Sequence, residues 1–184
     1  MRIWNTGAEF DLGAAVAALG TFDGVHIGHQ ALIRRAIERS RELGAASVVC
    51  TFDRHPLSLI CPERAPKPLT ALEEKLEKFE RMGVDGVLLT AFTPEFAATP
   101  PRAYIEALSR DLGLRGVVAG FNYSFGAQGK GDAALIRELA GPLGYRAEIV
   151  EPVRDGEDTV SSTLIRALIA RGEIARARRL LALR

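Results

Sequence analysis

Residues 19–29 read Leu19-Gly20-Thr21-Phe22-Asp23-Gly24-Val25-His26-Ile27-Gly28-His29. This stretch follows an apolar run and precedes a helical pattern that begins at Gln30. A strand, a glycine turn and a helix start bring free backbone N–H groups and the positive end of the helix dipole together, which makes an anion site. The two histidines lie three positions apart and add hydrogen-bond donors to that site. The stretch therefore predicts phosphate chemistry at the start of the first helix.

The same alternation of a short apolar run with a helical pattern extends along the whole chain. Apolar runs predict strands at residues 14–19, 46–52, 86–91, 116–119 and 147–150. Helical periodicity predicts helices at residues 30–43, 71–82, 102–112, 132–143, 162–171 and 174–181. Strands that alternate with helices at this spacing form right-handed βαβ units, so we expect an α/β fold with a doubly wound parallel sheet. Ligands of such sheets bind at the carboxyl ends of the strands, near the point where the strand order reverses.

Residues that start and stop helices support these boundaries. Thr70 and Glu73 have the spacing of a capping box, and Thr99 stands before a Pro-Pro pair that suits the first turn of a helix. Glycines that suit a left-handed position directly after a helix are Gly44, Gly83, Gly113, Gly144 and Gly172. The loops expected at the ligand edge are then residues 20–29, 53–69, 92–99, 120–131 and 151–161. The proline-rich residues 56–68 are long for a turn, so we expect a functional flap there.

The composition is that of a folded domain of ordinary size. The chain has 184 residues, of which 47% are hydrophobic, and we expect one domain over residues 1–184. A net charge of +1 gives no reason to expect a nucleic-acid partner. Without a signal-peptide pattern or an apolar run of transmembrane length, the sequence predicts a cytoplasmic protein with no membrane partner. Cys50 and Cys61 form no C-x-x-C pair, so free thiols are expected, with a disulfide between them as the minor alternative.

The glycine turn and the helix start supply the first set of candidate site residues. They are Gly20, Thr21, Phe22, Asp23, Gly24, His26, Gly28 and His29. Gly20 and Gly24 allow the backbone to turn tightly against a phosphate, and Gly28 leaves room for a flat base or a ribose. His26 and His29 can donate hydrogen bonds to phosphate oxygens as charge moves onto them. The alternative is a histidine pair that only caps a helix, and the length of the pattern weighs against it.

A second set opens the helix predicted at residues 162–171. Ser161, Ser162 and Thr163 offer hydroxyl and N–H groups to phosphate oxygens. Arg166 adds a planar charged fork one turn into that helix. Taken alone, this pattern is more typical of an N-cap followed by a surface arginine. Together with the first set it becomes specific for a phosphate site.

Two further segments follow predicted strands at the same edge. The loop at residues 120–132 is rich in glycine and aromatic residues, and its simpler interpretation is a glycine turn packed by Phe121 and Phe125. It is not a Walker A phosphate loop, because Lys130 is followed by glycine instead of Ser or Thr. The segment at residues 51–56 ends a strand with a histidine, which at such a position is usually structural or exposed.

Together, the four segments resemble the bacterial FAD synthetases, the FMN adenylyltransferase half of the bifunctional riboflavin kinase/FAD synthetase family. H-x-G-H at the start of the first helix is the signature of nucleotidyltransferases, and this family reads G-x-F-D-G-V-H-x-G-H-Q there, which residues 20–30 match. Residues 160–166 match the family pattern [IV]-S-S-T-x-I-R. Residues 120–126 match G-x-[DN]-[FY]-x-F-G, with asparagine at position 122 where many members carry aspartate. In the family segment T-F-x-P-H-P, Arg54 replaces the usual proline, which puts the flavin contacts of that segment in question.

The resemblance implies a Rossmann-like nucleotidyltransferase fold and a reaction of ATP with FMN that gives FAD and pyrophosphate. It implies catalytic roles for His26, His29 and Arg166. It implies ATP binding by Gly20, Thr21, Phe22, Asp23, Gly24, Gly28, Ser161, Ser162 and Thr163. It implies FMN binding by Phe52, His55, Pro56, Asn122 and Phe125. Mg²⁺ is expected to arrive with ATP, because the sequence has no carboxylate cluster with the spacing of a dedicated metal site.

The sequence differs from the bifunctional members of this family in the domains that it contains. The bifunctional proteins continue into a β-barrel riboflavin kinase domain, and the alternating strands of such a barrel are absent from these 184 residues. We therefore expect a lone adenylyltransferase domain, with a separate riboflavin kinase as the source of FMN.

Three other functions stay open at this point. Another H-x-G-H adenylyl- or cytidylyltransferase would share the histidines, but it is not expected to share the Asn122 loop or the segment that ends at His55 and Pro56. A flavin-nucleotide binding protein without catalysis would not need the paired histidines. Riboflavin kinase itself is disfavoured by the absent barrel.

Overall fold

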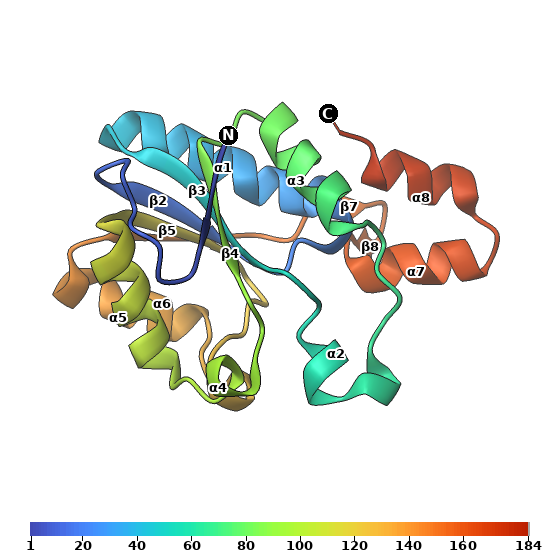
Figure 1. Ribbon diagram of the computed structural model, residues 1–184. Helices are drawn as coiled ribbons and strands as arrows, with labels where there is room; N and C mark the ends of the chain where they lie inside the picture. Colours follow the sequence, from blue (N-terminus) through green and yellow to red (C-terminus); the bar gives the residue numbers. More distant parts are fainter. Residues whose placement is uncertain (184) are drawn as a thin grey trace.

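Six parallel strands form one sheet in the order β1-β4-β3-β2-β5-β6 (Figure 1). The computed structural model describes residues 1–183. The strands are β1 (Arg2–Asn5), β2 (Ala15–Leu19), β3 (Ala46–Phe52), β4 (Gly86–Thr90), β5 (Leu114–Gly120) and β6 (Arg146–Val150). From β2 the chain proceeds outward to β3 and β4, then returns to the other side of β2 to form β5 and β6. The predicted doubly wound parallel sheet is therefore confirmed, and its order reverses between β2 and β5.

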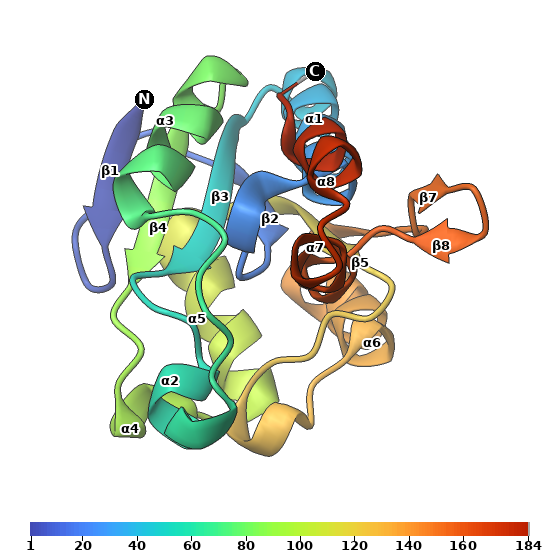
Figure 2. The ribbon, with the colours of Figure 1, turned by 90° about the vertical axis from the view of Figure 1, so that its right-hand side faces the viewer.

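Helices cover both faces of the sheet (Figure 2). One face carries α1 (Ile27–Leu43) and α3 (Leu72–Arg81), and the other carries α5 (Pro101–Leu112) and α6 (Ala133–Leu143). Strand β2 is buried over its whole length because it packs on both layers. Val16 and Ala18 contact the first layer, while Ala17 and Leu19 contact the second. This central strand holds the turn that follows it in a fixed position between the layers.

Two helices at the end of the chain pack on the start of α1. They are α7 (Ser162–Ala170) and α8 (Ile174–Leu181), and their apolar faces enclose Ile27. Gln30 Nε2 donates a hydrogen bond to the carbonyl of Ala182 at 2.8 Å. A side chain at Gly24 would meet Leu181 Cδ2 at 2.9 Å, so glycine is needed for this close approach. The end of the described chain thus rests directly on the glycine turn.

The structure adds short elements that the periodicity did not predict. They are β1, the helices α2 (Leu57–Ile60) and α4 (Pro94–Ala97), and a hairpin of β7 (Arg154–Asp155) and β8 (Asp158–Thr159). Strand β1 buries only Trp4, so it shows no alternating pattern. The hairpin projects from the body of the protein, and Arg176 of α8 holds it through Asp155 and Asp158 (Figure 2).

Two predicted side-chain caps are wrong. Helix α3 begins after Ala71 without a side-chain capping bond, because Thr70 Oγ1 accepts a hydrogen bond from the Gly24 N–H at 3.3 Å instead. Helix α5 begins with Pro101 as predicted, but Thr99 does not cap it, since its hydroxyl donates to the Glu95 carbonyl. The predicted left-handed glycines are confirmed, with φ from 57° to 81° at Gly44, Gly83, Gly113, Gly144 and Gly172.

Both cysteines are free thiols, as expected. Cys50 is buried in β3, where burial raises its pKa to about 12. Within residues 1–183, no helix combines the length and the apolar character that crossing a membrane requires.

Candidate functional site

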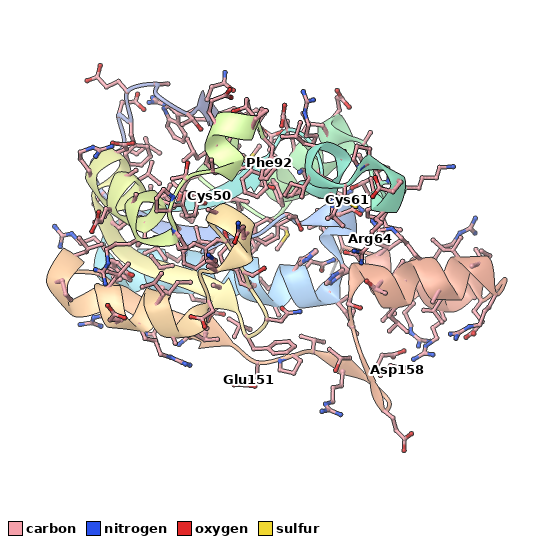
Figure 3. All side chains as sticks on the ribbon, turned by 90° about the horizontal axis from the view of Figure 1, so that it is seen from below. Cys50, Cys61, Arg64, Phe92, Glu151 and Asp158 are labelled. Carbon is pink, nitrogen blue, oxygen red and sulfur yellow. The ribbon has the colours of Figure 1, made fainter. Side chains whose placement is uncertain are left out.

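A pocket of about 890 Å³ opens at the carboxyl ends of β2, β3, β5 and β6. In a view from below, Phe92 and Arg64 lie on one side of it and Glu151 on the other, while Asp158 marks the hairpin that points away (Figure 3). The pocket brings together all predicted site residues except Gly24: His26, His29, Arg166, Gly20, Thr21, Phe22, Asp23, Gly28, Ser161, Ser162, Thr163, Phe52, His55, Pro56, Asn122 and Phe125. The predicted ligand edge of the sheet and the pocket therefore coincide.

Gly24 is the exception, because it does not line the pocket. It has φ of +84° and faces away from the pocket, against the side chains of Leu69 and Leu181. Its N–H donates to Thr70 Oγ1. Gly24 shapes the turn from behind and leaves the pocket wall to its neighbours.

The turn after β2 places the two histidines on the first turn of α1. Phe22 and Val25 adopt left-handed backbone conformations, with φ of 52° and 46°, which non-glycine residues rarely do and which often mark functional sites. His26 becomes the N-cap of α1, and its Nδ1 accepts a hydrogen bond from the His29 N–H at 3.3 Å. The two imidazole rings stack with centroids 3.6 Å apart. Because Nδ1 of His26 is an acceptor here, its proton is on Nε2, which can donate to a ligand.

Both imidazoles are neutral at neutral pH. Burial lowers the pKa of His26 to about 4, although the nearby Asp23 carboxylate opposes this shift. Burial, the neighbouring His26 and the Lys75 ammonium together lower the pKa of His29 well below its usual value. His29 Nδ1 is buried and has no hydrogen-bond partner among residues 1–183. A neutral imidazole has one N–H donor, so the pair offers directed hydrogen bonds to a ligand while remaining uncharged.

An ion pair joins the glycine turn to α7 and to the flap. Arg166 Nη2 pairs with Asp23 Oδ2, and Arg166 Nε donates to the carbonyl of Lys67 at 2.9 Å. Asp23 Oδ1 accepts from the Leu69 N–H at 2.9 Å. Asp23, predicted to bind ATP, and Arg166, predicted to be catalytic, therefore contact one another in this structure. Sequence reasoning did not predict this pairing.

The serines at the start of α7 also have partners within the protein. Ser161 is the N-cap, and its Oγ accepts from the Leu164 N–H at 3.1 Å. Ser162 Oγ donates to the carbonyl of Asp23 at 2.9 Å. The N-cap interpretation of this segment is thus confirmed for Ser161, while the start of α7 still lines the pocket.

Aromatic side chains form the opposite wall. Phe52, Phe92 and Phe96 meet edge to face, with centroids 5.2 to 5.6 Å apart. Tyr104, Tyr123 and Phe125 continue this wall. Of these six residues, only Phe52 and Phe125 belong to the predicted set. The loop at residues 92–99 was predicted at this edge, but its phenylalanines carried no distinguishing pattern.

The flap and the loop after β5 hold the remaining predicted residues. His55 Nδ1 accepts from the Leu57 N–H at 3.1 Å, so this histidine helps to start α2. Asn122 is exposed at the end of β5 and lines the pocket. It lies across the reversal of strand order from the histidines.

Sequence reasoning missed Lys75, a buried lysine of α3 directly behind the turn. Its Nζ donates to the carbonyl of Phe52 at 3.0 Å, to Thr51 Oγ1 at 3.3 Å and to the carbonyl of Thr21 at 3.4 Å. A lysine on a helix is ordinarily a surface residue. The available signal was its spacing, because Lys75 lies four positions before the buried Phe79 on the same helix face.

Comparisons with known proteins agree with the geometry. Residues 9–164 match the family model described as FAD synthetase. The chain is 39% identical over 167 residues to a bifunctional riboflavin kinase/FMN adenylyltransferase of Listeria monocytogenes, covering 90% of this chain and 53% of that protein. It is 34% identical to an FAD synthetase of the same organism, covering 93% of this chain and 70% of the relative. The chain thus spans about half the length of the first of these relatives.

Solved structures share the fold. A Streptococcus pneumoniae protein described as a macrolide-efflux protein superposes with a TM-score of 0.84 at 28% identity, covering 98% of this chain and 60% of that chain. Pantoate-β-alanine ligase from Francisella tularensis superposes with a TM-score of 0.56 at 14% identity, covering 91% and 73%, which shows the fold alone. With the family model spanning most of the sequence, the chain belongs to the FAD synthetase family.

Proposed function

We propose that this chain transfers the AMP group of ATP to FMN and releases pyrophosphate, which makes it an FMN adenylyltransferase. The observation that carries the proposal is the pairing of two neutral, stacked histidines with an aromatic wall in one pocket. The histidines suit phosphate groups and the aromatic wall suits a flat isoalloxazine ring. Membership of the FAD synthetase family supports the same reaction.

The reaction needs positioning more than covalent chemistry. A phosphate oxygen of FMN attacks the α-phosphorus of ATP, a P–O bond forms, and the bond to the β-phosphate oxygen breaks as pyrophosphate leaves with both electrons. The chain must hold two anions in line and stabilise the charge that develops on the leaving group. We infer that His26 Nε2 and the His29 imidazole donate hydrogen bonds to the ATP phosphates in this step.

The remaining predicted roles divide between the two substrates. For ATP, the inferred contacts come from the turn and from the start of α7: Gly20, Thr21, Phe22, Asp23, Gly28, Ser161, Ser162 and Thr163. Arg166 uses two of its donors within the protein and has further N–H groups for a phosphate. For FMN, the inferred contacts are Phe52, His55, Pro56, Asn122 and Phe125.

Mg²⁺ is the metal expected to accompany the triphosphate of ATP in this reaction. Residues 1–183 contain no group of three or more His, Cys, Asp or Glu side chains that could hold a metal ion. The Asp23 carboxylate is occupied by Arg166 and by the Leu69 N–H. We therefore propose that the triphosphate oxygens carry Mg²⁺ into the pocket. We further propose a cytoplasmic site of action.

One assay tests the proposed function against its alternatives. Purified chain is mixed with FMN, Mg²⁺ and ATP labelled on its α-phosphate, and flavin fluorescence is followed while products are separated. Loss of fluorescence together with label in FAD is the expected result. Binding of FMN without labelled FAD would identify a non-catalytic flavin-nucleotide binding protein. In a parallel reaction with phosphopantetheine in place of FMN, transfer of the label to that acceptor would identify a different H-x-G-H transferase.

Substitution of Asn122 is expected to weaken FMN use selectively. Asn122→Ala removes a donor and an acceptor, whereas Asn122→Asp keeps an acceptor. Both variants lose the donor beside the anionic phosphate, which costs about 1–3 kcal/mol. Alanine also loses the acceptor, so KM for FMN should rise more in the alanine variant. The measurements are KM for FMN, KM for ATP and Tm. A lowered Tm with unchanged KM values in both variants would leave Asn122 a scaffold residue of its loop.

A further inference from the structure

The buried ammonium of Lys75 lies where the strands β2 and β3 end. Its three N–H donors meet three acceptors, the carbonyls of Thr21 and Phe52 and the Thr51 hydroxyl. Thr51 Oγ1 also donates to the Thr21 carbonyl at 3.1 Å, so the ends of both strands are joined to one side chain. The histidine turn leaves from the first strand and the flap leaves from the second.

We propose that Lys75 is a positioning residue for AMP transfer. It fixes the backbone from which the histidine turn and the flap depart, and it places a positive charge directly behind the phosphate site. This inference rests on the proposed function and adds a residue to it.

Lys75 forms no salt bridge within residues 1–183, so its charge can act on the pocket. All three of its hydrogen-bond acceptors are uncharged groups. The nearest carboxylates have other partners: Asp23 pairs with Arg166, and Asp53 accepts from the Phe92 N–H and from Arg54. Burying a charge without an ion pair costs free energy, and such groups are typical of functional sites.

Two histidines of the pocket respond to this charge. Burial is the main cause of the low pKa of His29 in α1 and of His55 directly before the flap, and the Lys75 ammonium lowers both further. Lys75 therefore helps to keep both imidazoles neutral. The same positive field would favour the approach of FMN and ATP, whose phosphates repel one another.

Lys75 also predicts how activity depends on pH. Burial lowers its pKa to about 8, while Asp23 and Asp53 oppose the shift. Below that pH the Lys75 ammonium donates hydrogen bonds to all three acceptors. Above it the neutral amine has one N–H donor fewer and carries no positive charge. Activity is therefore expected to be complete below pH 8 and to fall as the pH rises through that value.

The experiment compares Lys75→Met, Lys75→Arg and the control Lys78→Met. Methionine keeps the aliphatic stem without the charge, and arginine keeps the charge to well above pH 10. Lys78 lies on the same helix and donates to the carbonyl of Gly24, outside the pocket lining. For each protein, kcat and both KM values are measured from pH 6 to 10, together with Tm.

Lys75→Met is expected to lower kcat by about tenfold or more at pH 7.5 and to lack the decline near pH 8. Lys75→Arg should recover activity and shift the decline to higher pH, whereas Lys78→Met should keep the decline of the parent. A decline near pH 8 that persists in Lys75→Arg would overturn the proposal, as would parental kcat in Lys75→Met. A drop in Tm with an unchanged pH profile would show a purely structural lysine.

A readout without substrate separates this proposal from the proposed function. The pKa of His29, measured by NMR of its imidazole, should rise when Lys75 is replaced by methionine and stay constant in Lys78→Met. This measurement remains valid if the chain makes no FAD, and it needs only folded protein. An unchanged pKa of His29 in a folded Lys75→Met variant would refute the electrostatic role.

Discussion

Replacement of His29 by alanine is expected to lower kcat for FAD formation by about 10²-fold or more. A donor aimed at charge that develops in the transition state is worth about 3–4 kcal/mol, since it strengthens as the charge forms. His29 is neutral and stacks on His26, so its ring is held in place before substrates arrive. KM for FMN should change much less than kcat, because the interaction is made mainly in the transition state.

A second variant controls for packing at this position. The His29 ring meets Phe22 edge to face at 5.3 Å, so alanine also removes aromatic contacts. His29→Phe keeps an aromatic ring without a donor and should lose as much kcat while preserving more of the Tm. FAD formation at the parental rate in either variant would contradict the assigned role of His29.

Gly126→Ala is expected to lower the free energy of unfolding by about 3 kcal/mol or more. Gly126 has φ of +70° and ψ of −175°, a region open essentially only to glycine. An added Cβ would lie 2.5 Å from the Cα of Pro101, at the first turn of α5. Neither the backbone of the loop nor that of the helix start can move away at low cost. The free-energy costs of backbone strain and of the steric clash therefore add. In thermal unfolding, Tm should fall by roughly 6–12 °C.

Gly44→Ala is the matched control for this substitution. Gly44 also has a positive φ, of +58°, but an added Cβ there meets nothing within 4 Å. Its cost is then the left-handed conformation alone, about 1–2 kcal/mol. If Gly126→Ala melted no lower than Gly44→Ala, the close contact between the loop at residues 120–131 and α5 would be refuted.

The central elements of the fold were predictable because buried strands appear in the sequence as apolar runs and the helices that cover them show helical periodicity. Strand β3 occupies the predicted residues 46–52, and every long helix begins and ends within a few residues of its expected range. Edge elements bury few residues, so they produce no such pattern. Strand β1 depends on Trp4 lying over Gly86, where a side chain would come within 2.0 Å of its ring, and this contact joins residues far apart in the sequence.

The candidate site was predictable in its location more than in its internal contacts. Residue spacing brought the histidines to a helix start and the loops to one sheet edge. It did not indicate that Arg166 would pair with Asp23, which lies 143 positions away, or that Lys75 would be buried between two strand ends. Such partners are set by tertiary packing, and the roles of the individual residues in binding stay predictions.

The contact between the end of the described chain and the glycine turn relates the packing of α8 to ligand binding at the turn. Leu181 packs against Gly24, and Gln30, one residue after His29, binds the carbonyl of Ala182. Substitutions that loosen this contact of α8 are therefore expected to weaken nucleotide binding at the turn. By thermodynamic reciprocity, bound nucleotide would then stabilise the packing of α8 by the same factor.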